Sequence, residues 1–278
     1  MQRREPVRLD LHIHTTASDG SWSPEAVVHG AIAGGLDVIA IADHDTCAAI
    51  PSARQAAGTQ QLQVIPAIEV SSSHDGRDVH VLGYGIDPEA AAITDHTRRA
   101  TLRRDDRMRQ MLERLRWQGI DVPFSAVEAA AGPDRVVIGR PHLAQALVTE
   151  GHATSVWDAF DRLIGDDAEA FVPAHVLDPA GAIELVRAAG GIPVWAHPPA
   201  ELVDTLLPVL KAAGLQGLEV YRPRSKRAQV LRLESICRTA GLLMTGGSDW
   251  HNPDGGAVLG DFHVSSGAVE RFLEAVEI

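Results

Sequence analysis

The chain has 278 residues, 45% apolar and 22% charged, with a formal net charge of -12, a composition typical of a soluble globular enzyme with a large core. The excess of acidic side chains argues against binding of extended duplex nucleic acid, because no general basic surface is available to displace counterions. With only two cysteines, the chain cannot form a disulfide framework. It has no apolar run of ~18 residues, which argues against a membrane partner, and MQRREP shows no signal-peptide pattern. We therefore predict a cytoplasmic protein.

Seven short runs rich in β-branched and apolar residues predict strands, with longer helical patterns between them. The helical patterns open with Ser-Pro or Asp-Pro and close on glycine, as in residues 23–35 and 178–191. This alternation indicates parallel pairing with right-handed crossovers, so the predicted fold is α/β, a barrel or an open doubly wound sheet. The length is normal for a single α/β barrel. The predicted strands lie within residues 7–14, 36–45, 62–72, 78–86, 192–198, 215–223 and 242–251.

Residues 87–167 break the alternation, because their pattern is helical throughout and begins with the arginine-rich TRRATLRRDDRMRQMLERLRWQG. We interpret this region as a helical insertion in one loop of the barrel. The barrel itself would then consist of residues 1–86 and 168–278. An insertion at the mouth of a barrel is expected to act as a lid that sets the size of the substrate.

Polar side chains interrupt the apolar strands near their carboxyl ends, and almost all of them are potential metal ligands. In a parallel barrel, active sites assemble at that end from the loops of several strands. His12 and His14 can bind one cation together, since residues two apart on a strand share a face. The candidate ligands are His12, His14, Asp19, His44, Glu69, His80, His197, Asp249 and His251.

The ligand types restrict the metal. Imidazole mixed with carboxylate, without thiolate, suits manganese, iron or zinc better than calcium or a structural zinc. These ligands are too many for one ion, so a cluster of two or three divalent ions, roughly 3.5–4 Å apart, is the economical interpretation. Singly, Glu69 could be an edge-strand acid, His80 a satisfied core histidine, and Asp249 and His251 part of an ordinary turn. Their joint convergence on strand ends favours the cluster.

Six motifs, spread over residues 10–251, resemble the PHP family, named for its polymerase and histidinol phosphatase members. They are DLHIHTTASDG, ADHDT, AIEVS, VHVLGYG, WAHP and GSDWH. The resemblance implies a distorted, TIM-like (β/α)7 barrel of seven parallel-type strands. It also implies a trinuclear metal site, with manganese favoured over iron, zinc or magnesium.

By position, the resemblance implies a separate ligand set for each ion. The sets are His12, His14, Glu69 and Asp249 for the first ion, Asp19, His44 and His251 for the second, and Glu69, His80 and His197 for the third. Asp10 and Asp43 lie next to ligands and are expected to orient them. By spacing alone, both could equally be buried strand acids without a catalytic part.

Phosphoester hydrolysis is the chemistry that such a site suits. It requires charge neutralisation on the phosphoryl oxygens, an aligned nucleophile and a protonated leaving group. We expect a hydroxide that bridges two ions to be the nucleophile, since metal binding lowers the pKa of water to roughly 7. A nearby imidazole or a metal-bound water would protonate the leaving alkoxide. The residues predicted to act in catalysis are Asp19, His44, His197 and Asp249.

The stretches IGRPHLAQAL and YRPRSKR resemble PHP members that act on nucleoside 3′,5′-bisphosphates or on short 5′-phosphorylated oligonucleotides. We therefore expect a small nucleotide or short oligonucleotide substrate, with removal of the 3′-phosphate of a bisphosphate favoured; no oligomeric state is predicted. The predicted substrate-binding residues are Arg140, His142, Arg222 and Arg224. Arg140 and Arg224 are predicted to clamp a second phosphate in bidentate fashion. Alternatively, Arg140 is a surface helix residue.

The arginines of RRATLRRDDRMRQ lie outside the predicted site. They alternate with Asp105 and Asp106 at helical spacing. That pattern is typical of a solvated, salt-bridged helix face.

Three other functions compete with a nucleotide phosphatase. A histidinol-phosphate phosphatase would use the same metal cluster. An amidohydrolase acting on C–N bonds would need a strand-end lysine to bridge the ions, but the lysines Lys211 and Lys226 fall in helical or loop patterns. A non-catalytic metal-binding regulatory module would be expected to lack ligand residues, and none is missing from the motifs.

Overall fold

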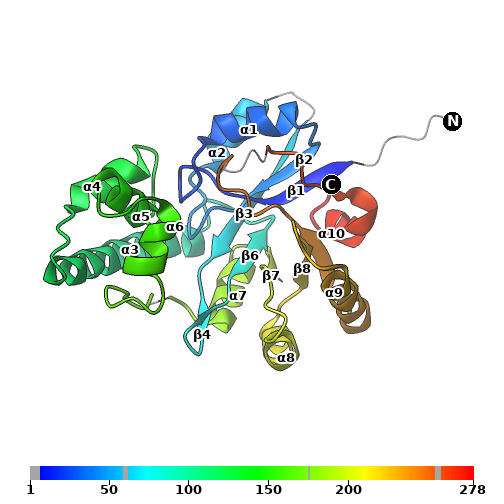
Figure 1. The fold of residues 1–278 in the computed structure, drawn as a ribbon. Helices are drawn as coiled ribbons and strands as arrows, with labels where there is room; N and C mark the ends of the chain where they lie inside the picture. The colour runs from blue at the N-terminus through cyan, green and yellow to red at the C-terminus, as the bar shows by residue number, and fades with distance from the viewer. Residues whose placement is uncertain (1–6, 59–61, 175, 254–257) are drawn as a thin grey trace.

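The computed structural model describes residues 7–58, 62–174, 176–253 and 258–278 (Figure 1). Within these ranges, eight strands form one sheet in the order β10-β1-β2-β3-β6-β7-β8-β9, and β4 and β5 form a small hairpin. The strands are β1 (Arg8–Ile13), β2 (Val38–Ile41), β3 (Gln63–Val70), β4 (Ser73–His74), β5 (Arg77–Asp78), β6 (Val81–Tyr84), β7 (Ile192–Trp195), β8 (Gly217–Tyr221), β9 (Leu243–Gly246) and β10 (Val264–Ser265).

The sheet curls into a nearly closed barrel. After β9, the Trp250 carbonyl accepts a hydrogen bond from His14 N (2.9 Å), and Trp250 N donates to the His12 carbonyl (3.3 Å). These bonds join the last long strand to the first. Inside the curl, Leu9, Ala40, Ala67, Leu82 and Val194, each from a different strand, belong to one apolar cluster. The predicted distorted α/β barrel is confirmed, and each of the seven predicted runs contains a strand.

One feature differs from the implied set of parallel strands: β6 runs antiparallel to both β3 and β7. The connection between β3 and β6 spans residues 71–80 and carries the β4–β5 hairpin. A parallel crossover needs a dozen or more residues, usually with a helix, so this short link returns the chain in the opposite direction. The short β10 also pairs antiparallel, with β1.

Helices surround the sheet and begin where the sequence predicts. Ser23 caps the first of them through Ala26 N (3.3 Å), and Asp178 caps α7 through Gly181 N (2.7 Å). No helix in the described ranges is both long and apolar enough to cross a lipid bilayer. The helices are α1 (Pro24–Ala33), α2 (Ile50–Ala57), α3 (Ala91–Trp117), α4 (Phe124–Ala131), α5 (Arg140–Thr149), α6 (Val156–Ala159), the π-helix η1 (Phe160–Ile164), α7 (Pro179–Ala188), α8 (Val203–Ala213), α9 (Arg227–Ala240), the 3-10 helix η3 (Ser266–Ala268) and α10 (Glu270–Ala275).

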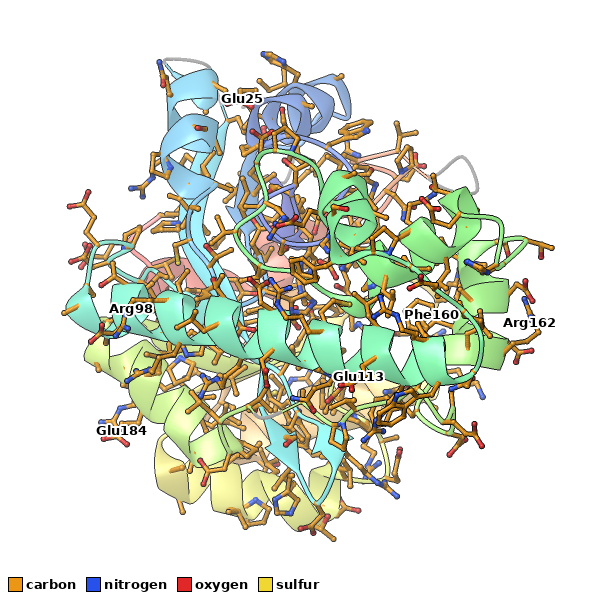
Figure 2. All side chains as sticks on the ribbon, turned by 90° about the vertical axis from the view of Figure 1, so that its left-hand side faces the viewer. Glu25, Arg98, Glu113, Phe160, Arg162 and Glu184 are labelled. Atoms are coloured by element: carbon orange, nitrogen blue, oxygen red, sulfur yellow. The ribbon has the colours of Figure 1, made fainter. Side chains whose placement is uncertain are left out.

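The elements from α3 to η1 lie between β6 and α7 and contain helices alone among the described residues. They have an apolar cluster of their own, which includes Met111, Leu115, Val127, Leu143 and Ile164. Figure 2 shows the long α3 crossing this side of the molecule in front of the barrel. The helices therefore form a packed layer beside the strand ends.

Candidate active site

The candidate ligands gather at one rim of the barrel. His14, His44, His197 and Asp249 each follow the carboxyl end of a parallel strand, so they come to the same edge. His80 instead precedes β6. Because β6 is antiparallel, its amino end lies at that same edge, which explains how His80 joins the other ligands.

His12, His14 and Asp249 have the spacing of a single-ion site, because one ligand atom of each lies within 4.8 Å of the others, and Glu69 lies next to both histidines. His12 Nε2 lies 3.4 Å from both Glu69 Oε2 and Asp249 Oδ1. His14 Nε2 lies 3.4 Å from Glu69 Oε2 and 3.2 Å from Asp249 Oδ1. Neighbouring ligand atoms of an ion bound at about 2.0–2.2 Å stand about 3.0–3.5 Å apart. These three residues and Glu69 make up the set that the PHP resemblance implies for the first ion.

A second group surrounds Asp19. Its Oδ1 lies 3.4 Å from His251 Nε2 and 3.6 Å from His14 Nδ1, and its Oδ2 lies 3.7 Å from His44 Nε2. One ligand atom from each of these four residues lies within 4.8 Å of the others. The structure thus brings together the residues predicted for the second ion and adds His14 to them.

The third group lies on the other oxygen of Glu69. Glu69 Oε1 is 2.9 Å from His80 Nδ1 and 3.0 Å from His197 Nε2, and its Oε2 is 3.0 Å from His44 Nδ1. The side chain of Glu69 is 1% exposed. All nine predicted ligands therefore lie in one cluster, with Glu69 at its centre.

Several ligand atoms of this cluster are buried without a hydrogen-bond partner among the described residues. They are His12 Nε2, both ring nitrogens of His14, His44 Nδ1 and Glu69 Oε2. A buried polar atom without a partner is costly, and coordination of cations would satisfy the carboxylate oxygen and one nitrogen of each neutral ring. The residues present thus fit divalent metal ions.

Two residues of the cluster, His14 and Glu69, carry the charges that suit cations. Burial and the neighbouring His251 and His44 lower the pKa of His14 to about 3, so its ring is neutral near pH 7. Burial opposes ionisation of Glu69, but His44, His12 and His80 hold the pKa of its carboxyl well below the usual range. A neutral imidazole and an ionised carboxylate are the forms that bind metals.

Asp10 and Asp43 contact the backbone and hydroxyl groups around the ligands. Asp43 accepts hydrogen bonds from Thr15 N and Oγ1 (both 2.7 Å) and from Ser18 Oγ (2.6 Å), within the loop that joins His14 to Asp19. Asp10 accepts hydrogen bonds from Ser248 N (2.8 Å) and His12 N (3.4 Å). Both carboxylates shape the backbone on which ligands are carried.

Glu219 is a buried residue that sequence reasoning missed. Its Oε1 lies 2.9 Å from His12 Nδ1, and its Oε2 accepts a hydrogen bond from His197 N (2.7 Å). An acid inside the apolar run LEVY was the available signal. Two of the cluster's histidines thus share this carboxylate.

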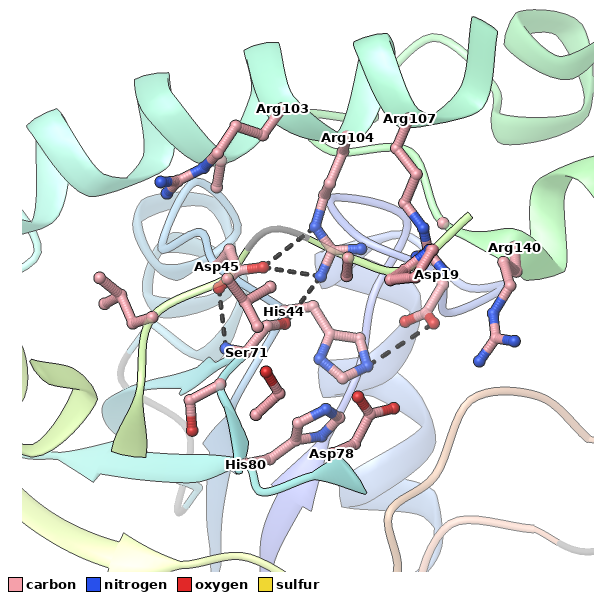
Figure 3. Close-up of a pocket in the computed structure, with 18 of the residues that line it drawn as sticks. Asp19, His44, Asp45, Ser71, Asp78, His80, Arg103, Arg104, Arg107 and Arg140 are labelled. Carbon is pink, nitrogen blue, oxygen red and sulfur yellow. Dashed lines mark hydrogen bonds and ion pairs between the residues drawn. The ribbon is translucent and has the colours of Figure 1, made fainter. Parts of the chain in front are cut away.

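A cavity of about 700 Å³ opens beside the cluster. Asp19, His44 and His80 form part of its barrel side. Figure 3 shows arginines that extend from α3 and α5 on the other side. The arginines that line it next to these helices are Arg103, Arg104, Arg107 and Arg140, and the aromatic side chains are Phe160 and Phe171.

The predicted substrate-binding residues fall in different places. Arg140 lines the cavity, whereas Arg224 is exposed and is not one of the lining residues. Arg222 lies beside the cluster, 3.8 Å from Asp249 Oδ2. His142 is buried and its Nδ1 accepts a hydrogen bond from Gly139 N (3.0 Å), so it caps the start of α5. The structure does not bring Arg140 and Arg224 together at this cavity.

The α3 arginines that the sequence analysis left out of the site line the cavity. Arg103, Arg104 and Arg107 share one helix face, because residues three and four apart are neighbours on a helix. The spacing with Asp105 and Asp106 indicated a solvated face instead. Arg98, Arg99 and Arg109 of the same run are exposed. Helical spacing alone does not show which arginines of a helix face solvent and which face another part of the chain.

Asp45, the residue after His44, anchors α3 to the barrel. Asp45 Oδ2 accepts hydrogen bonds from Arg104 Nε (3.0 Å) and Nη2 (2.6 Å). Asp45 Oδ1 lies 2.9 Å from His96 Nε2 and accepts from Ser71 N at 2.9 Å. This buried network ties the helical layer directly to the strand end that carries His44.

Known proteins resemble the chain over most of its length. A model of the PHP domain matches residues 10–129. A 5′-3′ exoribonuclease from Haemophilus influenzae is 34% identical, over 91% of this chain and 93% of the relative. The chain belongs to the PHP family.

Other PHP relatives have different names. A phosphoribosyl 1,2-cyclic phosphate 1,2-diphosphodiesterase from Eggerthella lenta is 32% identical, over 88% of this chain and 95% of the relative. A 3′,5′-nucleoside bisphosphate phosphatase from Chromobacterium violaceum is 30% identical, over 91% of each. A structure from Bifidobacterium adolescentis, assigned to the metal-dependent phosphoesterases, has a TM-score of 0.87 and 33% identity over 97% of each chain. This PHP protein is therefore a metal-dependent hydrolase of phosphoric esters.

Proposed function

We propose that this PHP protein removes the 3′-phosphate from nucleoside 3′,5′-bisphosphates, giving the 5′-monophosphate and phosphate, and that it also accepts short 5′-phosphorylated RNA. Two or three divalent cations, with manganese favoured, would be held by Glu69 and the eight candidate ligands around it. One relative is named a 5′-3′ exoribonuclease and another a 3′,5′-nucleoside bisphosphate phosphatase. The observation that carries the proposal is the arginine-lined cavity beside the cluster.

The arginines supply a site for a second phosphate. Arg107 Nε donates to the Val172 carbonyl (2.7 Å), a neutral partner. Burial, Arg140 and Arg104 lower the pKa of Arg107 to about 10. Arg104 and Arg140 pair with Asp45 and Asp166, whereas Arg107 forms no ion pair with a described acid that would balance its charge. A phosphate would supply that balance and accept paired hydrogen bonds from a guanidinium. We therefore assign the second phosphate to Arg107 and Arg140, in place of the predicted pair Arg140 and Arg224.

Aromatic rings lie next to these guanidinium groups. The Arg140 guanidinium carbon lies 5.7 Å from the centre of the Phe160 ring and 5.3 Å from that of Phe171. Arg107 lies 5.6 Å from the Phe171 ring. A ribose or base would find an apolar wall here, next to the groups that would bind its phosphate.

Each part of the site has a separate task in this reaction. Bound divalent cations would neutralise the phosphoryl oxygens and lower the pKa of a water nucleophile. Asp19, His44, Glu69 and Asp249 would hold the cations close to the phosphate that is cleaved. Arg107 and Arg140 would orient the substrate by its other phosphate. Residues 87–167 would act as the lid that limits substrate size.

Hydrolysis in the presence of Mn²⁺ tests the proposed substrate; it is followed by release of phosphate, or of mononucleotides from the RNA, or by opening of the cyclic ester. The panel is a nucleoside 3′,5′-bisphosphate, a 5′-monophosphate, a short 5′-phosphorylated RNA, histidinol phosphate and a ribose 1,2-cyclic phosphate with a 5-phosphate. We expect the bisphosphate to give the highest kcat/KM. A preference for histidinol phosphate or for the cyclic ester would contradict the proposed substrate and leave the metal centre intact.

Replacement of Arg107 tests the second-phosphate site. Loss of a charge-assisted hydrogen bond costs about 1.5–3 kcal/mol, so Arg107→Ala should lower kcat/KM for the bisphosphate about 10–100-fold. Its effect on a nucleoside 3′-monophosphate should be small. Arg98→Ala is the matched control, since Arg98 is exposed on the same helix and pairs with Asp95. An equal loss with both substrates would contradict the assignment.

A further inference from the structure

Glu219 has partners from two separate strand ends, although it is fully buried within β8. Its Oε1 lies 2.9 Å from His12 Nδ1 on β1. Its Oε2 accepts the backbone hydrogen bond of His197, after β7, at 2.7 Å. The nearest cation, Arg222, has its Nε 3.6 Å from Glu219 Oε2. Each oxygen of this carboxylate is thus committed to a different candidate ligand.

The first contact fixes the tautomer of His12. A carboxylate oxygen can only accept a hydrogen bond, so His12 Nδ1 must carry the proton. In the neutral ring, Nε2 then keeps its lone pair, and this atom faces Glu69 Oε2 and Asp249 Oδ1 at 3.4 Å. A partner that holds the distal ring nitrogen in this way orients a histidine ligand and increases its basicity.

The second contact holds the backbone of His197. This residue has a φ of 32°, a left-handed conformation that a residue with a side chain rarely adopts without support. The hydrogen bond from His197 N to Glu219 keeps the peptide in that conformation. The ring of His197 then reaches Glu69 Oε1 at 3.0 Å.

We propose that Glu219 is a positioning residue that couples two cation sites of the cluster. One oxygen of Glu219 orients the ring of His12 toward one ion, and the other holds the backbone of His197, whose ring faces another ion. The two cation sites therefore form together. The inference rests on the proposed function in that it takes His12 and His197 as ligands. It predicts that neither site reaches full affinity when Glu219 cannot accept both hydrogen bonds.

Glu219→Gln is the sharpest variant, because it preserves shape but leaves one acceptor oxygen where two are needed. Its amide NH₂ must face either His12 Nδ1, which drives the ring proton to Nε2, or His197 N. Calorimetric titration of chelator-treated protein with MnCl₂ should show affinity about 10–100-fold weaker for at least two ions. Saturating Mn²⁺ should restore most of kcat, and the thermal midpoint without metal should stay near wild type.

Glu234→Gln is the matched control. Glu234 accepts a hydrogen bond from Tyr221, at the end of the same strand, but lies on α9 and contacts no candidate ligand in the described structure. Its Mn²⁺ affinity should equal that of wild type. Wild-type affinity and stoichiometry in Glu219→Gln would overturn the proposal. So would weakening of a single ion alone.

Two further variants keep the test decisive. If Glu219→Gln does not fold, Glu219→Asp is titrated instead: it keeps both acceptors but withdraws them by one methylene, and at least tenfold weaker binding is expected. Wild-type binding by that variant would also overturn the proposal. His12→Ala distinguishes failure of the Glu219 proposal from failure of the proposed function. If this variant bound Mn²⁺ as wild type does, His12 would not be a metal ligand, and the proposed function itself would be contradicted.

Discussion

His12 needs close contact with the segment that follows β9. A Cβ at Gly247 would lie 2.3 Å from His12 Cβ and 2.4 Å from His12 N, distances that real side chains do not reach. Glycine at this position therefore lets β9 approach β1 closely enough to bring Asp249 to the histidines. The cluster thus depends on a residue that contributes no ligand atom.

Gly247→Ala should displace His12 and destabilise the fold. Overpacking of a tight contact costs about 1–3 kcal/mol, and we expect a loss of unfolding free energy in that range, together with reduced Mn²⁺ content. Urea unfolding and elemental analysis measure the two effects. Gly267→Ala is the control, since a Cβ there would have nothing within 4 Å. Normal metal content in Gly247→Ala would show that the contact does not position His12.

The sequence could predict the nine candidate ligands because each one interrupts or follows an apolar strand run. Glu219 also interrupts such a run, but its partners His12 and His197 are 207 and 22 residues away. An isolated buried acid gives no indication of which distant groups it bonds. For the same reason, spacing could not separate Arg224, which is exposed, from Arg107, which lines the cavity.

At the level of elements, Asp45 is one of the residues that attach α3 to the barrel. Asp45 is 2% exposed and has a φ of 55°, and it bonds Arg104 and His96 from α3. Thr97 Oγ1 adds a hydrogen bond to the Asp45 carbonyl (2.9 Å). Asp45 therefore contributes to the position of the cavity arginines relative to His44, together with Ser71, whose Oγ accepts a hydrogen bond from Arg104 Nη2 (2.8 Å).

Asp45→Asn should loosen α3 and weaken substrate binding. Breaking a buried ion pair costs about 3–5 kcal/mol, which we take as an upper bound because Arg104 is partly exposed. Hydrogen exchange should become faster in residues 91–104, and KM for the bisphosphate should rise. Asp95→Asn removes an exposed pair on the same helix and should cost no more than about 1 kcal/mol. Unchanged exchange in Asp45→Asn would contradict the anchoring role.

The same anchor predicts how stability depends on acid. Burial opposes ionisation of Asp45, but Arg104 and His96 hold the pKa of its carboxyl well below the usual range. Its stabilising contribution is therefore complete above the unfolded pKa of about 3.9 and is lost as the pH falls further. The Asn variant should lack this part of the acid dependence.

Strand and helix order were predictable from the sequence, since each predicted run contains a strand. The direction of β6 was missed, although the ten-residue link between β3 and β6 is too short for a helical crossover. That direction matters, because it brings His80 to the rim where the other ligands lie. The length of the link between β3 and β6, rather than the hydrophobic pattern, indicates the direction of β6.

For the whole molecule, cation binding should be linked to proton release. Burial opposes protonation, but Glu69 and Asp19 raise the pKa of His44 to about 9, and Asp19 raises that of His251 to about 9. Both rings thus hold protons near pH 7 when cations are absent, and both must lose them to act as ligands. Apparent Mn²⁺ affinity should weaken as the pH falls from 9 to 6. Calorimetry in buffers of different ionisation enthalpy would detect the released protons, and an affinity independent of pH would contradict the linkage.

The most direct test of the account is to strip the protein with a chelator and return Mn²⁺ stepwise, measuring bound metal and phosphate release on the same samples. The stripped protein should be inactive, and activity should rise with bound Mn²⁺ up to two or three equivalents. Glu69→Gln should not bind two or three equivalents of Mn²⁺, and added Mn²⁺ should not restore its phosphate release. Full activity in wild-type protein that holds less than one equivalent of metal would contradict the central claim.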